Sequence, residues 1–109
     1  MTARALVPDW IRGRSPAAPA QLLARVAEMT AGRVIETTPG AALISAGEAG
    51  MAAVLRAGCL TRDTALDLLA VDALVTYAFE AAADEPEALE TLSGDALVRI
   101  AALAGSPTT

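Results

Sequence analysis

The sequence predicts an all-α fold, a small bundle of about four main helices with an extended N-terminal arm and a short extended connector at 33–39. Hydrophobic residues make up 54% of the 109 residues but aromatic residues only 3%, so the core must consist of aliphatic side chains and alanine. Alanine is the best helix former, whereas strand-rich domains use β-branched and aromatic residues. Apolar residues also recur at helical spacing in four segments, which indicates four amphipathic helices in one domain.

The chain divides into three predicted parts, an N-terminal arm at 1–19, a helical bundle at 20–105 and a frayed tail at 106–109. Three prolines in the arm prevent a long helix there, namely Pro8, Pro16 and Pro19. The arm also holds the only tryptophan, Trp10, beside Ile11. A large apolar ring is expected to act as an anchor, docking either on the bundle of its own chain or on a partner.

The first bundle helix is predicted at about residues 20–31, with Gly32 as its C-terminal cap. In the connector, Val34 and Ile35 favour extended backbone, and Pro39 disfavours helix directly before it. We expect no second strand in this chain with which one short strand could pair. The segment is therefore predicted to be a connector or, alternatively, a strand that pairs across a dimer.

The second bundle helix is predicted at about residues 40–57, after Thr38 as N-cap and a first-turn proline. Gly47 lies near the centre of its apolar face and Gly50 at the side. Each glycine in a helix interior costs about 1 kcal/mol relative to alanine. Such a cost is usually offset where a neighbouring backbone approaches closely. The sequence therefore indicates close helix packing within the chain, a dimer seam or a pocket.

The third bundle helix follows Thr61, a predicted N-cap, and reaches about residue 83. Asp72, Thr76 and Glu80 are spaced by four and form one polar stripe, while most of the remaining circumference is apolar. The longest uncharged run within 68–83 is seven residues, and a bilayer span needs about 20. This helix is therefore predicted to be the central helix of the bundle, with no membrane span.

The last helix is predicted to begin at Pro86, with Glu87 in its first turn favourably placed near the positive end of the helix dipole. Its buried face is expected to include Leu89, Leu92, Ala96, Ile100 and Leu103.

The composition disfavours an enzyme. The chain has no histidine and only one cysteine, Cys59, so the commonest general base and metal ligand is missing. Helix edges and caps already account for the paired carboxylates, including Asp72 with Glu80. We predict no catalytic residue, no metal site and no cofactor.

Charge is distributed unevenly. The net charge is −5, with an excess of arginine in residues 1–33 and an excess of acidic groups in the rest. An acidic body disfavours nucleic-acid binding, because phosphates require clustered basic groups. With one cysteine and no export signal at the N-terminus, we expect a cytoplasmic protein.

These observations predict a non-enzymatic helical module for protein–protein interaction or self-association, expected to be a homo-oligomer or to bind another protein. The alternative is a helical bundle that binds a small apolar ligand or lipid, with a cavity beside the helical glycines. Apolar residues and glycines of the arm and the second and third bundle helices form the predicted interface. They are Trp10, Ile11, Gly47, Gly50, Met51, Val54 and Phe79.

Overall fold

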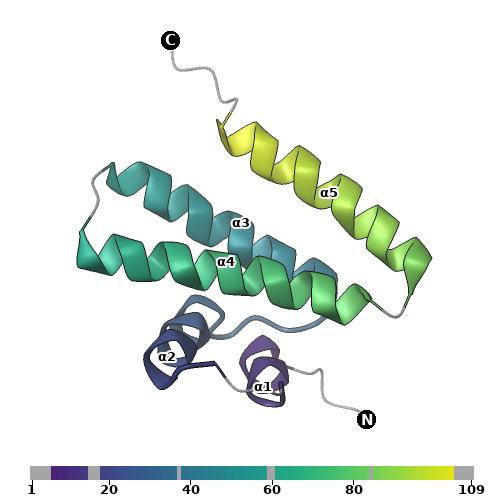
Figure 1. Cartoon of the computed structure of the whole chain (residues 1–109), viewed down its shortest axis with the longest axis horizontal. Coiled ribbons are helices and arrows are strands. Elements are labelled where there is room, and N and C mark those ends of the chain that lie inside the picture. The colour runs from purple at the N-terminus through teal and green to yellow at the C-terminus, as the bar shows by residue number, and fades with distance from the viewer. Residues whose placement is uncertain (1–5, 15–17, 37, 59–60, 84, 105–109) are drawn as a thin grey trace.

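The computed structural model describes residues 6–14, 18–36, 38–58, 61–83 and 85–104. These residues form an all-α bundle, as the sequence predicts (Figure 1). The helices are α1 (Val7–Arg12), α2 (Ala20–Met29), α3 (Pro39–Ala57), α4 (Arg62–Ala82) and α5 (Pro86–Ala104). No helix in the described ranges has the length and apolarity needed to cross a membrane.

The centre of the bundle is an antiparallel hairpin of α3 and α4, which make the most extensive helix contact in the molecule. Helices α1 and α2 pack on one side of this hairpin, and α5 lies on the other (Figure 1). Helix α5 meets the hairpin near its own N-terminus and then diverges, so that its C-terminal end points away from α4 (Figure 1). As predicted, α4 is the central helix.

The helix starts follow the predicted capping signals. The Thr38 hydroxyl accepts a hydrogen bond from the Ala41 amide at 3.1 Å, and Pro39 occupies the first turn of α3. Thr61 caps α4 through a capping box, in which Thr61 and Thr64 each accept a hydrogen bond from the other's amide. At the end of α3, Gly58 has φ +69°, a conformation that favours glycine.

The helical glycines allow α3 to approach its neighbours closely. A Cβ atom on Gly47 would lie 3.4 Å from Val75 Cγ2 in α4, and one on Gly50 would collide with the Met29 side chain of α2. Both glycines therefore serve packing inside one chain. Around this contact the core contains Leu43 and Leu74, which are almost completely buried.

The N-terminal arm, in which the prolines prevent a long helix, contains the short helix α1. Val7 and Ile11 in α1 are 1% and 2% exposed and belong to the main core. The connector pairs with this arm, because Leu6 and Val34 form an antiparallel bridge and the Val7 amide donates a hydrogen bond to the Arg33 carbonyl at 3.0 Å. The expectation that the extended segment has no partner in its own chain is therefore wrong. Backbone pairing across 28 positions leaves no local signal in the sequence.

Replacing Gly94 by alanine is expected to stabilise the protein by about 1 kcal/mol, because alanine is the better helix former. Helix α5 is continuous through Gly94, and a Cβ atom there would have no atom within 4 Å. Thermal unfolding followed by circular dichroism measures the change, which corresponds to a rise of about 4–8 °C in Tm. As a matched control, Gly40→Ala should lower Tm, because its Cβ would lie 3.2 Å from the Ala78 carbonyl oxygen. A lower Tm for Gly94→Ala would contradict the structure of α5.

Candidate interaction surface

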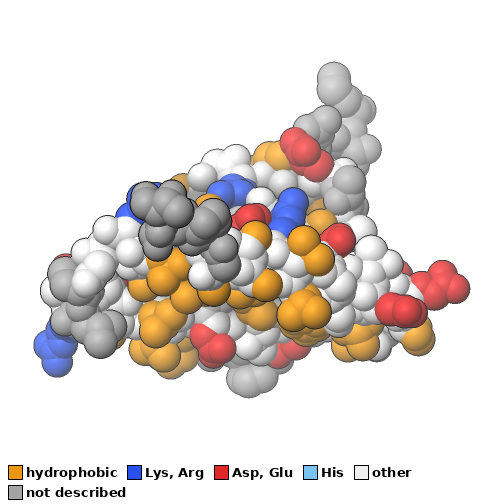
Figure 2. Space-filling view, turned by 90° about the horizontal axis from the view of Figure 1, so that it is seen from above, with side chains coloured by type: hydrophobic (Ala, Val, Ile, Leu, Met, Phe, Trp, Pro, Cys, Tyr) orange, Lys and Arg blue, Asp and Glu red, His pale blue; other side chains and the backbone are white. Residues whose placement is uncertain are grey.

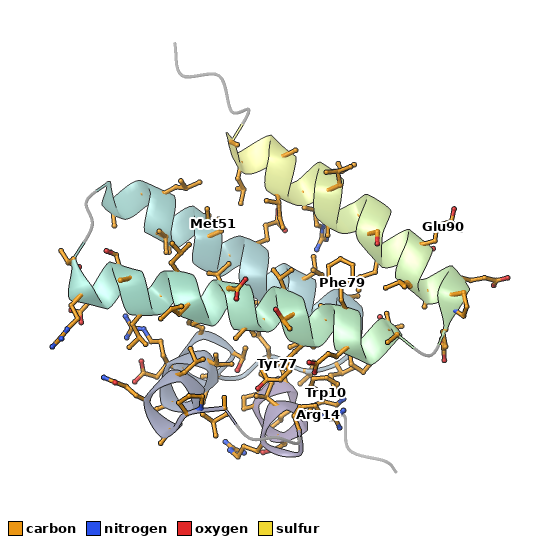
Figure 3. All side chains as sticks on the ribbon, in the orientation of Figure 1. Trp10, Arg14, Met51, Tyr77, Phe79 and Glu90 are labelled. Carbon is orange, nitrogen blue, oxygen red and sulfur yellow. The ribbon has the colours of Figure 1, made fainter. Side chains whose placement is uncertain are left out.

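Trp10, the predicted anchor, contacts the protein's own bundle. Its ring meets the Tyr77 ring of α4 edge to face, with centroids 6.3 Å apart and planes at 85°. The Arg14 guanidinium lies over the indole, 4.1 Å from its centroid, and Figure 3 shows the three side chains together below α4. The ring pair joins α1 to α4, and the cation–π contact packs Arg14, just after α1, on the outer side of the same indole.

The other residues of the predicted interface lie at different depths. Ile11 and Gly47 are buried inside the molecule. Gly50, Met51, Val54 and Phe79 are half-buried, and Phe79 packs against the core. Met51 and Phe79 lie in opposite halves of the α3–α4 hairpin (Figure 3). The structure therefore does not gather these residues into one surface.

A different group of apolar side chains is exposed. Among the described residues, the large hydrophobic side chains with at least 40% exposure are Leu6 (40%), Leu55 (50%), Leu68 (42%), Leu69 (59%), Leu97 (71%) and Val98 (69%). Four of them fall in consecutive pairs, Leu68 with Leu69 in the N-terminal half of α4, and Leu97 with Val98 in α5. Figure 2 shows hydrophobic side chains forming a band across one face of the molecule, with acidic side chains along its edge.

Ala65, Leu68 and Leu69 form what we call the α4 patch. Helical geometry places Ala65 between the two leucines on the outer face of α4. The patch borders an open hollow of about 680 Å³, lined by Ala65, Leu68, Leu69, Val71, Asp72 and Val75. Every residue that lines this hollow belongs to α4. The patch thus combines protruding leucine side chains with a shallow apolar depression.

Opposite charges flank the α4 patch. Arg62 lies one turn before it and Asp72 one turn after it, and both side chains are exposed. Within the described residues, neither takes part in an ion pair. Glu80, at the far end of the polar stripe, is also exposed. A partner that approaches the patch therefore meets an available cation at one end and an available carboxylate at the other.

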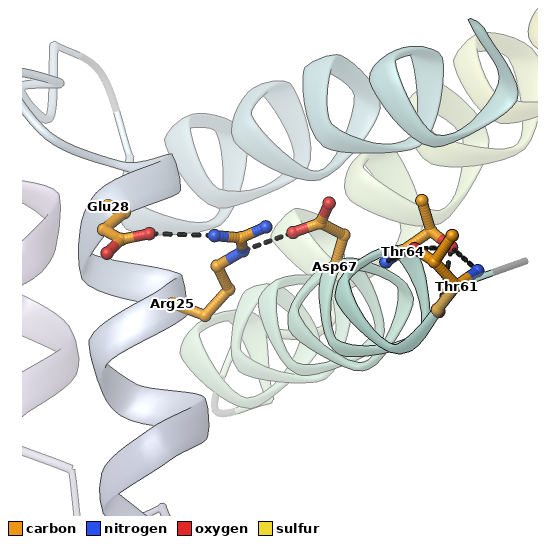
Figure 4. A network of polar contacts seen from close by, with 5 residues as sticks. All are labelled: Arg25, Glu28, Thr61, Thr64 and Asp67. Atoms are coloured by element: carbon orange, nitrogen blue, oxygen red, sulfur yellow. Dashed lines mark hydrogen bonds and ion pairs between the residues drawn. The ribbon is translucent and has the colours of Figure 1, made fainter. Parts of the chain in front are cut away.

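By contrast, Asp67 on the opposite side of α4 is already paired. Arg25 of α2 bonds to Asp67 of α4 and, at 3.0 Å, to Glu28 (Figure 4). The hydrogen bond to the Asp67 carboxylate, followed by that to Glu28, raises the pKa of Arg25 above its ordinary value. This network joins α2 to α4 and leaves the outer face of α4 uncovered.

Further hollows lie elsewhere on the described part of the chain. One of about 450 Å³ lies between the connector, α3 and α5, with Arg33, Ser45 and Arg99 among its lining. Another, of about 310 Å³, lies beside Gly50 and Met29. Among the described residues, no group of acidic or cysteine side chains is arranged to hold a metal ion.

Comparisons with known protein-family models, with curated proteins and with solved structures give no match to this chain.

The sequence does not directly indicate the α4 patch. Its wide apolar arc on residues 68–83 indicates neighbours on at least two sides of α4, and these neighbours are present. Helix α5 buries Leu92 and Ala96, and its Arg99 forms an ion pair with Glu48 of α3 at 3.7 Å. Leucines at the start of α4 nevertheless stay exposed. A signal was available in the adjacent pair Leu68 and Leu69, since adjacent helical residues point about 100° apart and one helix neighbour cannot cover both.

Proposed function

We propose that this chain is a helical protein-interaction module that binds a protein partner through the α4 patch. The observation that carries the proposal is the exposure of Leu68 and Leu69, at 42% and 59%, on a helix whose other faces are packed in the bundle. An exposed apolar patch with a polar border is typical of an interaction site. Removing these leucines from water on binding would supply the main favourable free energy of association.

The shape of the patch favours a protein over a small apolar ligand. Small-molecule sites are concave and bury most of the ligand surface. The hollow on α4 is open, its lining comes from a single helix, and the leucines beside it are exposed. A second helix laid along α4 would contact both the leucines and the hollow. The sequence offers space for a ligand beside Gly47 and Gly50. At Gly47 this space holds the Val75 side chain, and at Gly50 it is an open hollow of about 310 Å³.

Site-specific photo-crosslinking tests this proposal. A benzophenone amino acid is placed at Ala65 or at Thr76, both exposed on the outer face of α4, and at the control position Ala101, exposed on α5. On irradiation in cells that express the chain, we expect discrete protein adducts from the two α4 positions and none from Ala101. Adding Leu69→Glu to the Ala65 probe should remove the adduct.

The same adducts distinguish the possible partners. An adduct with twice the mass of one chain identifies a second copy, and any other discrete mass identifies a different protein. Equal crosslinking from all three positions, or the absence of discrete adducts from both α4 positions, would contradict the proposed function.

A further inference from the structure

We infer that the partner at the α4 patch is a second copy of this chain, with the two α4 helices antiparallel across a two-fold axis. The inference rests on the proposed function and adds the identity and orientation of the partner. It is carried by two features of the same surface, its shape and its flanking charges.

The shape of the patch is self-complementary. A two-fold interface presents the same surface on both copies, so each protruding group must meet a recess on that same surface. In an antiparallel pair of α4 helices, Leu69 of each copy can lie opposite Ala65 of the other. Leu69 is 59% exposed, and Ala65 borders the open hollow. A large side chain thus faces a small one twice across the axis.

The same register pairs the flanking charges. Positions 65 and 69 are equally distant from position 67, and so are positions 62 and 72. Placing Leu69 opposite Ala65 therefore places Arg62 of each copy opposite Asp72 of the other, which creates two intermolecular ion pairs. Both side chains are exposed and lack an ion-pair partner within the described part of their own chain. Shape and charge thus specify the same register independently.

The remaining charges favour the antiparallel orientation over a parallel one. Arg56 and Arg62 are exposed where α3 ends and α4 begins, although Asp63 also lies there. Glu85, Glu87 and Glu90 are exposed at the opposite end, around the start of α5. Figure 2 shows a basic side chain at one extremity of the molecule and acidic side chains at the other. A parallel pair would bring like charges together, whereas the antiparallel pair separates the acidic corners.

Asp63 and Asp67 do not oppose this pairing. Helical geometry directs both side chains away from the outer face that carries Ala65, and Asp67 is already bonded to Arg25. Glu80 lies beyond the start of the partner's α4 in this register. A contact made through a few turns of one helix buries little surface, so we expect a weak dimer that dissociates on dilution.

A charge-reversal cycle tests the inference, with the dimer dissociation constant measured by sedimentation. Arg62→Glu and Asp72→Arg should each weaken the dimer about tenfold, because two ion pairs become two repulsions. The double variant, with both charges exchanged, should return to within about threefold of the wild type. All of these positions are exposed, and unchanged thermal unfolding of the variants confirms that the fold is intact.

The Asp72→Arg variant separates the proposed ion pair from a general effect of net charge. The chain carries a net charge of −5, so removing negative charge reduces repulsion between copies and on its own would strengthen the dimer. Glu90→Arg, at an exposed position on α5 (Figure 3), makes the same change in net charge outside the contact. We expect this control to dimerise as tightly as the wild type or slightly more tightly.

A dimer strengthened by Asp72→Arg, or a double variant no tighter than the single variants, would overturn the antiparallel register. If the wild-type chain remains monomeric, the inference that the partner is a second copy is wrong. In that case, a crosslinked adduct of a different protein at the α4 patch would still support the proposed function. The absence of any patch-specific adduct would reject the proposed function as well.

Discussion

Leu74→Ala is expected to lower the free energy of unfolding by about 3 kcal/mol, the largest stability effect that we predict for one substitution. Leu74 is fully buried at the centre of α4, where its Cβ would lie 3.8 Å from a Cβ on Gly47 of α3. Truncation removes apolar burial and leaves a cavity in the contact between α3 and α4. Chemical denaturation followed by circular dichroism measures the change.

The matched control is Leu97→Ala, which removes the same atoms from a side chain that is 71% exposed. Its free energy of unfolding should stay within about 0.5 kcal/mol of the wild type. Equal losses in the two variants would contradict the assignment of Leu74 to the core. Because domains of this size are stabilised by only about 5–15 kcal/mol, the difference between the variants should be clear.

Leu69→Glu is expected to weaken self-association about a hundredfold, since the carboxylate would lose water against the apolar surface of the partner. The patch contains no basic side chain to compensate, and Arg62 of the partner is opposed by Asp72 in the proposed register. Equilibrium sedimentation of the variant measures the effect. Its fold should be unchanged, because Leu69 is 59% exposed.

Leu97→Glu serves as the matched control, because it introduces the same charge at a more exposed leucine on α5. It should dimerise as the wild type does, apart from a small effect of net charge. If Leu97→Glu abolished self-association and Leu69→Glu did not, the interface would lie on α5 and not on α4. That result would contradict the proposal.

The helices of the bundle could be predicted because their signals are local. Thr38 with Pro39, Thr61 and Pro86 each mark a helix start within one turn, and Gly58 marks a helix end. Caps and prolines act on neighbouring backbone groups, so these signals can be interpreted from short segments of sequence. The predicted boundaries accordingly agree with the structure to within two residues.

The docking of the arm could not be predicted in detail, because it depends on pairs that are far apart in the sequence. Leu6 pairs with Val34, and Trp10 contacts Tyr77. An anchor role for Trp10 follows from its chemistry, but its partner residue does not. The apolar pattern of α1 is also too short to indicate a helix, because Val7 and Ile11 cover a single turn.

The exposed surface was the hardest feature to predict. Hydrophobic periodicity shows which face of a helix is apolar, but the path of the next helix decides how much of that face is covered. Here α5 covers one end of the hairpin and diverges from the other, which leaves Leu68 and Leu69 exposed. Gly47 of α3, a residue of the predicted interface, accordingly packs against Val75 of α4 within the same chain.

The most direct test of the proposed dimer is the solution mass of the unaltered chain, measured by light scattering over a hundredfold range of protein concentration. We predict a mass that rises with concentration from 11.0 kDa, the mass of one chain, towards twice that value, as a weak reversible dimer requires. A mass that stays at 11.0 kDa over the whole range would contradict the second copy as the partner at the α4 patch.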